Sequence, residues 1–239
     1  MNKKFLRFCL LTLATFILSS CNDEFGLNEI KGNGLTYHEY FKEIDELDRR
    51  TDVTYYKPLE IDDIIKHSPE SIRKIQQNFN ETNWPFQVNK KEGYLISGKN
   101  SEGKINNQIQ LSFFNISEYD KVEEFIVVSI SELDTNPLTA FHLENDFDFV
   151  GNKIKRFELK DDMPIYQQIL SSGKAMSYKY YDYNQSNNEI VINYTAANEL
   201  YTYYEGYVYH IGYLINNSVD DKNLMHNQIL KLVKGNILN

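Results

Sequence analysis

Two serine–lysine pairs have a spacing that could support nucleophilic catalysis. Ser71 and Lys74, and likewise Ser101 and Lys104, lie three residues apart, and on a helix this spacing can place a lysine beside a serine hydroxyl, as in penicillin-recognising enzymes. Those enzymes also use a Lys-Thr-Gly strand, which this sequence lacks. Ser71 falls in the first turn of a predicted helix and Ser101 in a predicted turn, so we predict structural roles for both and assign no catalytic residue.

The sequence contains no recognisable pattern of metal ligands. The histidines are scattered, without a His-Glu-x-x-His or Cys/His cluster: His38, His67, His142, His210 and His226. The carboxylates of Glu144, Asp146 and Asp148 alternate and could converge on Ca²⁺ if a loop curled around the ion. A calcium loop of the EF-hand type would need glycine and glutamate where the chain has Phe149 and Lys155. We therefore predict neither a metal nor another cofactor.

Tyrosine is the one unusual signal in the composition. Eleven of the 18 tyrosines fall between Tyr178 and Tyr213. Tyrosine joins a large apolar ring to a polar tip, so rows of it on a sheet can form a platform for a sugar or a protein. Ordinary sheet packing is the alternative interpretation, because tyrosine is a favoured strand residue. The candidate binding face consists of Tyr201, Tyr203, Tyr207, Tyr209 and Tyr213.

The first 21 residues have the organisation of an export signal. Positive charges at Lys3, Lys4 and Arg7 precede an apolar run over Phe8–Leu18, which is shorter than the roughly 20 residues needed to cross a bilayer. The run ends in Leu-Ser-Ser-Cys at residues 18–21. This ending resembles the lipobox of bacterial lipoproteins, in which an aliphatic residue and two small residues precede the acceptor cysteine.

The resemblance implies that residues 1–20 are removed and that Cys21 becomes the lipidated first residue, anchored to a membrane by its acyl chains. Acidic residues at Asp23 and Glu24 are similar to the surface-export signal of Bacteroidota lipoproteins. This resemblance favours an outer-membrane, surface-exposed location in the cell envelope, and the cell membrane of a Gram-positive bacterium is the alternative. Residues 21–34 carry three glycines and few apolar side chains, so we predict a lipidated tether there. A single globular domain is predicted over residues 35–239.

The composition limits the functions that this body can have. Removing the signal takes the formal net charge from −9 to −12, because the signal contains three positive and no negative side chains. An acidic body has no electrostatic attraction to nucleic acid. With Cys9 in the signal and Cys21 lipidated, no cysteine remains for a disulfide, so the fold must depend on its packed core.

Helical periodicity marks the two ends of the domain. Apolar residues at spacings of three and four predict an amphipathic helix over 35–50, a short helix over 58–65 and a third helix that begins with Ser68 as its N-cap. A closing helix is expected over 219–234, with Gly235 as its stop.

Strand patterns occupy the region between the helices. Residues 94–98 and 105–113 are expected to pair around the turn at 100–103, and Gln110 and Ser112 alternate with apolar neighbours as in a half-buried strand. A buried strand is expected over 125–130, whereas residues 141–157 and 165–170 are ambiguous. An antiparallel meander is predicted over 176–183, 189–195, 200–204 and 207–215. The predicted fold class is therefore α+β: N-terminal helices, then a mainly antiparallel sheet packed against a C-terminal helix.

These observations favour a lipid-anchored envelope protein that binds a protein or glycan partner and has no enzymatic activity. Two alternatives remain open at the level of sequence. An immunity or inhibitor lipoprotein could neutralise an exported toxin, with the acidic body suited to a basic partner. A hydrolase of glycans or peptides could use carboxylates that the sequence does not single out.

Overall fold

The computed structural model describes residues 26–37, 41, 50–140, 147–148, 151–171, 177–216 and 222–239. The predicted signal and Cys21 lie outside these residues, as does most of the predicted helix over 35–50. The elements follow one another as β1 (Glu29–Gly32), β2 (Thr51–Tyr56), α3 (Ile61–His67), α4 (Glu70–Glu81), β3 (Lys90–Lys99), β4 (Ile105–Ile116), β5 (Val122–Glu132), the 3₁₀ helix η2 (Pro137–Ala140), β6 (Lys153–Lys160), β7 (Met163–Ile169), β8 (Ser177–Asn184), β9 (Glu189–Ala196), β10 (Asn198–Tyr204), β11 (Tyr207–Leu214) and α5 (Lys222–Leu238).

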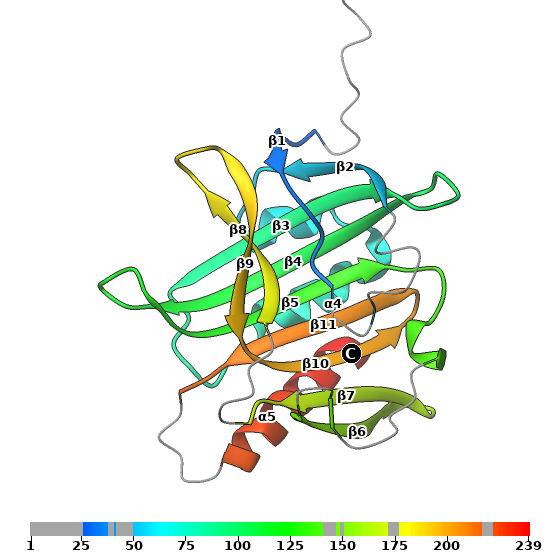
Figure 1. Ribbon diagram of the computed structural model, residues 1–239, viewed down its shortest axis with the longest axis vertical. Coiled ribbons are helices and arrows are strands. Elements are labelled where there is room, and N and C mark those ends of the chain that lie inside the picture. The colour runs from blue at the N-terminus through cyan, green and yellow to red at the C-terminus, as the bar shows by residue number, and fades with distance from the viewer. Residues whose placement is uncertain are drawn as a thin grey trace, which may run out of the picture.

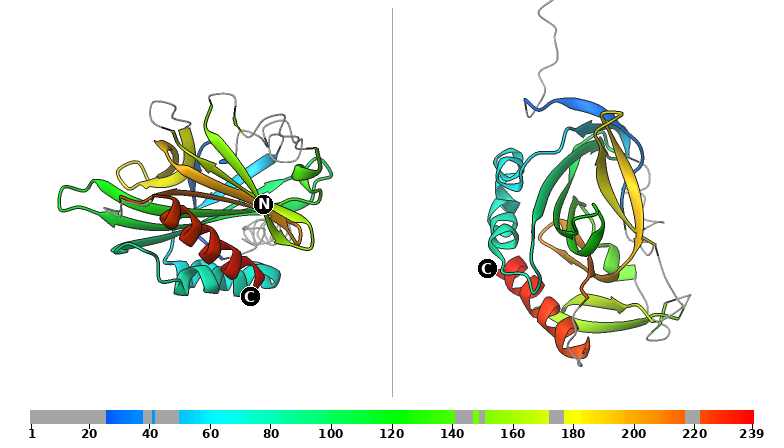
Figure 2. Two further views of the ribbon diagram at one scale, coloured as in Figure 1. Left: turned by 90° about the horizontal axis from the view of Figure 1, so that it is seen from below. Right: turned by 90° about the vertical axis from the view of Figure 1, so that its left-hand side faces the viewer.

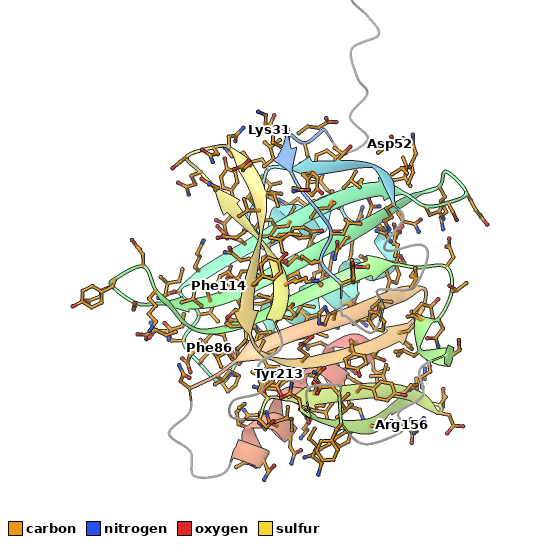
Figure 3. All side chains as sticks on the ribbon, viewed as in Figure 1. Lys31, Asp52, Phe86, Phe114, Arg156 and Tyr213 are labelled. Atoms are coloured by element: carbon orange, nitrogen blue, oxygen red, sulfur yellow. The ribbon has the colours of Figure 1, made fainter. Side chains whose placement is uncertain are left out.

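The described strands form one sheet in the order β6-β7-β10-β11-β5-β4-β3-β2-β1-β9-β8. Neighbouring strands are antiparallel except β1 and β9, which run parallel and share two residue pairs. In Figure 1 the sheet extends from β1 and β2 at the top to β6 and β7 at the bottom, with the β8–β9 hairpin crossing in front. Lys31 and Arg156 mark these two ends in Figure 3.

One face of the sheet packs against the helices. Ile64 of α3, Phe79 of α4 and Ile229 of α5 are buried in the same cluster as Leu111 and Phe113 of β4. Because strand side chains alternate between faces, the apolar residues of β4 at every second position supply this core. Figure 2 shows the three helices side by side on this face, with the β8–β9 hairpin on the opposite side.

The opposite face carries polar side chains among apolar ones, and it is also buried. Gln110 and Ser112 of β4 are both 0% exposed, so the prediction of a half-buried strand with these side chains in water is wrong. The β8–β9 hairpin covers them: Tyr180 packs on Phe114 with ring centroids 6.1 Å apart, and Tyr181 is hydrogen-bonded to Gln110. Period-two alternation separates two faces but does not reveal whether the polar face meets water or a second layer.

The predicted fold class is confirmed only in its coarse form. The described chain contains both helices and strands, and α5 packs on the sheet as expected. Strands dominate, however, and β2 lies among the N-terminal elements that were expected to be helical. Helix α4 begins at Glu70 with Pro69 as its N-cap, whereas the Ser68 hydroxyl bonds back to Ile64 O at the end of α3. None of the described helices combines the length and apolar character needed to span a membrane.

Two predicted boundaries are corrected by the strand pairing. Glu29–Gly32, assigned to the tether, forms β1 and pairs with β2 and β9, so the ordered fold begins before residue 35. The last four strands were expected to form one meander, but β9 pairs with β1, and β10 pairs with β7 and β11. At the other end, α5 runs through Gly235 to Leu238, so this glycine does not stop the helix.

Candidate binding cleft

The five tyrosines of the predicted binding face do not form an exposed platform. Tyr201, Tyr209 and Tyr213 are fully buried, Tyr207 is 8% exposed and Tyr203 is only partly buried. Tyr209 and Tyr213 belong to the core beneath the helices, whereas Tyr201 and Tyr203 belong to a separate cluster. Their prediction as a binding face is therefore wrong, and ordinary sheet packing accounts for them.

The hairpin register explains why these tyrosines are divided between the two faces. The turn at residues 205–206 pairs Tyr204 with Tyr207, which places Tyr201 opposite His210 and Tyr209 opposite Thr202. Directly opposed side chains share a face, so Tyr201 and Tyr209 point to opposite sides of the sheet. Each side is covered, one by helices and the other by neighbouring aromatic rings such as Tyr166, stacked on Tyr201 at 5.2 Å.

A serine–histidine–glutamate cluster lies on the sheet face that the β8–β9 hairpin covers. His210 of β11 is paired across the sheet with Ser129 of β5, and His210 Nε2 lies 2.6 Å from the Glu199 carboxylate. Burial lowers the pKa of His210 to about 3, and the positive charge of Lys179 acts in the same direction, so the imidazole is neutral. The rings of His210 and of Tyr178 in the covering hairpin pack in a T-shaped arrangement with their centroids 4.9 Å apart. Because these side chains are enclosed, we assign the cluster to the core.

The other candidates for chemistry also have structural roles. The Ser71 hydroxyl is hydrogen-bonded to the Tyr207 hydroxyl at 2.6 Å, and Ser101 lies in the turn between β3 and β4. Asp148 is buried and accepts hydrogen bonds from Asn152 and Gln168, whereas Glu144 and Asp146 lie outside the described residues. Across the part of the chain that the structure describes, no three His, Cys, Asp or Glu side chains come together as a metal site.

An open cleft forms where β1 separates from β9. The two strands pair only at Lys31 with Glu189 and at Gly32 with Ile190; beyond Gly32 the chain turns away from β9. The Tyr55 hydroxyl donates a hydrogen bond to Gly34 O at 2.7 Å, which holds the departing segment against β2. Burial raises the pKa of Tyr55, so its hydroxyl keeps the proton that it donates.

Two glycines make this separation possible. A Cβ atom on Gly32 would lie 2.3 Å from the ring of Tyr55, inside contact distance. Gly34 has a φ of +76°, in the left-handed region that favours glycine, and a Cβ there would approach Ile192 Cδ1 to 2.7 Å. The close fit of the backbone against Tyr55 and Ile192 therefore requires glycine at both positions.

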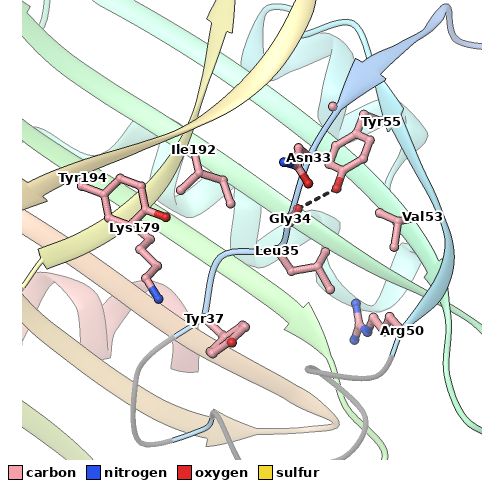
Figure 4. Close-up of a pocket in the computed structure, with 11 residues that line it drawn as sticks. Asn33, Gly34, Leu35, Tyr37, Arg50, Val53, Tyr55, Lys179, Ile192 and Tyr194 are labelled. Atoms are coloured by element: carbon pink, nitrogen blue, oxygen red, sulfur yellow. Dashed lines mark hydrogen bonds between the residues drawn. The ribbon is translucent and has the colours of Figure 1, made fainter.

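The resulting cavity has a volume of about 620 Å³, within the range of small-molecule and peptide sites. Figure 4 shows Lys179, Ile192 and Tyr194 on the hairpin side and Arg50 and Tyr55 on the β2 side, with residues 33–37 between them. Its full lining is Gly32, Asn33, Gly34, Leu35, Tyr37, Arg50, Val53, Tyr55, Lys179, Ile192 and Tyr194. A second cavity of about 700 Å³ shares five of these residues.

The lining of the smaller cavity carries positive charge and aromatic rings. Its two charged side chains are Arg50, whose Nη2 donates to Glu132 O, and Lys179, whose Nζ lies 5.4 Å from the centre of the Tyr37 ring. Among the described residues that line it there is no carboxylate, histidine or serine. The cleft is therefore suited to hold an anionic group beside aromatic surface. Of the side chains used in general acid–base or nucleophilic catalysis, its described lining contains only lysine and tyrosine.

Comparisons of this chain with protein-family models, with curated proteins and with solved structures give no match. The cleft therefore has to be interpreted from its own residues.

Sequence reasoning missed the residues that line this cleft. Gly32 and Gly34 were assigned to the tether because glycine is frequent in flexible segments, and Arg50 was assigned to the end of a helix. The closely spaced glycines were the one available signal, because they permit a tight backbone approach. Their partners Tyr55 and Ile192 are distant in sequence, so only the fold brings the site together.

Proposed function

We propose that this chain is a lipid-anchored protein of the bacterial cell envelope that binds a partner in the β1–β9 cleft and catalyses no reaction. The observation that carries the proposal is the lining of the cleft. Two cationic side chains and three tyrosines, Tyr37, Tyr55 and Tyr194, line one open cavity in a chain whose net charge is −9. Such a site favours a ligand with an anionic group and a surface able to stack on or hydrogen-bond with tyrosine.

The anchor remains the one inferred from the lipobox. Glu29, the first residue of β1, lies eight positions after Cys21, and an extended chain over these eight steps reaches roughly 28 Å. Acyl chains on Cys21 would thus hold the cleft near a membrane, and we favour the surface of the outer membrane. A protein or a glycan of the envelope is the partner expected there, and nucleic acid is not.

Site-specific crosslinking in intact cells tests the proposal. Tyr194 is 63% exposed at the cleft and Tyr119 is 90% exposed on the β4–β5 loop, so each can be replaced by a photoreactive phenylalanine derivative. We expect illumination to give a discrete adduct from position 194 and none from position 119. Lys179→Glu should abolish the adduct while leaving the protein folded and membrane-bound. An identical adduct from both positions, or one insensitive to Lys179→Glu, would refute the cleft as the binding site.

A further inference from the structure

The two outer edges of the β8–β9 hairpin differ in how their backbone groups are hydrogen-bonded. On the β8 edge, the Gln110 side chain from β4 satisfies the backbone of Tyr181. Gln110 Oε1 accepts a hydrogen bond from Tyr181 N at 2.7 Å, and Gln110 Nε2 donates to Tyr181 O at 2.8 Å. A side-chain amide therefore takes the place of the next strand, and this edge is closed at its centre.

The same two bonds fix which backbone groups of β9 face outward. Because Tyr181 directs both its N–H and its C=O away from β9, its partner Ile192 is in a non-hydrogen-bonded pair and directs its own groups away from β8. Tyr194, two residues further on and paired with Lys179, has the same orientation by alternation. Both residues line the cleft. Asn193, between them, directs its backbone groups toward Tyr180 of β8.

Strand β1 pairs with only the first part of the outer edge of β9, the edge that faces away from β8. Its last residue, Gly32, is paired with Ile190, and within the described chain no hydrogen bond reaches the backbone of Ile192 or Tyr194 from the cleft side. Residues 33–37 cannot return to pair with β9, because they are held elsewhere. The Tyr55 hydroxyl donates a hydrogen bond to Gly34 O. The backbone of Thr36 is bonded on both sides: its N–H donates to the Tyr181 hydroxyl, and its C=O accepts from the Gln108 side chain.

We propose that the outer edge of β9 at Ile192 and Tyr194 receives an extended peptide of a partner protein, which adds to the hairpin as a further strand. Main-chain hydrogen bonds to an open sheet edge supply affinity in this mode of recognition, and pockets for alternate side chains supply specificity. Among the described residues that line the cavity, Lys179 and Arg50 carry positive charge and none is a carboxylate, so the peptide carries an acidic side chain or a terminal carboxylate. This inference rests on the proposed function and narrows its ligand class from a protein or glycan to an acidic peptide.

Amide hydrogen exchange tests the geometry in the lipidated full-length protein, purified in detergent. The Ile192 and Tyr194 amides should exchange at least a hundredfold faster than that of Asn193, which is bonded to β8. Slow exchange at Ile192 and Tyr194 in the protein alone would mean that the edge is already occupied, and it would overturn the proposal.

Binding is tested with a phage-displayed library of random octapeptides, selected on the same protein. A selected peptide should protect the Ile192 and Tyr194 amides from exchange, and replacing its carboxylate by the amide should weaken binding at least tenfold in wild type but little in Lys179→Glu. Tyr194→Pro removes the outward N–H without touching the β8 pairing, and it should bind at least tenfold more weakly than Tyr194→Ala. Tyr119→Ala is the unaffected control.

If the proline variant fails to fold, N-methylation of the peptide tests the same main-chain hydrogen bonds, because it removes N–H donors from the ligand and leaves the protein unchanged. Methyl groups at alternate backbone nitrogens should abolish binding in one register and leave it unchanged in the other. Equal binding of both methylated forms, or self-association through this edge in place of peptide binding, would overturn strand addition. In that case, crosslinking at position 194 that depends on Lys179 would still support the cleft as a binding site. If neither the crosslink nor peptide binding is observed, both the proposed function and the strand-addition proposal are wrong.

Discussion

Replacing Gln110 by leucine should reveal how strongly a single side-chain amide holds the β8–β9 hairpin to the sheet. Leucine has a similar size but cannot hydrogen-bond, so the N–H and C=O of Tyr181 lose their partners at a site that is fully buried. Each unsatisfied buried backbone group costs roughly 1–3 kcal/mol. The free energy of unfolding should therefore fall by roughly 2–6 kcal/mol, a large part of the 5–15 kcal/mol typical of a domain.

Urea unfolding, followed by the fluorescence of the single tryptophan, measures this change. Trp84 is buried in the core beneath the helices, so its emission reports on global unfolding. The midpoint should move to lower urea concentration with an unchanged slope. Gln77→Leu, at an exposed position of α4, is the matched control and should change stability by no more than about 0.5 kcal/mol.

Gln110→Glu keeps only one of the two hydrogen bonds. The carboxylate can still accept from Tyr181 N, but it would be fully buried without a counter-charge and would repel Tyr181 O, so at neutral pH this variant should be no more stable than Gln110→Leu. A loss below about 1 kcal/mol for Gln110→Leu would refute the reasoning, because it would mean that the Tyr181 backbone finds other partners or is not desolvated.

Three further predictions follow from the fold and the anchor. Gly32→Ala should destabilise the protein by about 1–3 kcal/mol, because the new methyl group overlaps the Tyr55 ring, whereas Gly235→Ala inside α5 should stabilise it by up to about 1 kcal/mol in the same urea assay. Burial lowers the pKa of His210 to about 3, so the folded protein holds this proton less readily than the unfolded chain, in which histidine titrates near 6.5. The stability that depends on neutral His210 should be complete above about pH 6.5 and decline as the pH falls toward 3, and His210→Gln should flatten that part of the profile. Cys21→Ala should abolish palmitate labelling in cells, and persistent labelling would contradict the lipobox assignment.

Local sequence patterns predicted most individual elements correctly. The alternation of β4, the turn expected at 100–103 and the helical periodicity of the closing helix each placed an element within a few residues of its position. These signals succeed because a strand or a helix repeats over two or 3.6 residues, and its turns depend on adjacent residues. β1 was missed because its four residues, Glu29–Gly32, include one glycine and two charged side chains. Such a short polar segment has no strand periodicity that would predict its pairing with β2 and β9.

What the sequence by itself determined was therefore the approximate position of most strands and helices, though not of β1, β2, β6 or β7, and which side chains share a strand face. Only the tertiary structure decided which faces are buried and which edge stays open. The alternation of β4 predicts that Gln110 faces water. The side chain is nevertheless enclosed, because Tyr181, 71 residues later in the chain, lies over it. The cleft likewise exists because Tyr55 holds the segment after Gly32 away from β9. Such contacts join residues that are far apart in the chain, and no periodic pattern within one segment can encode them.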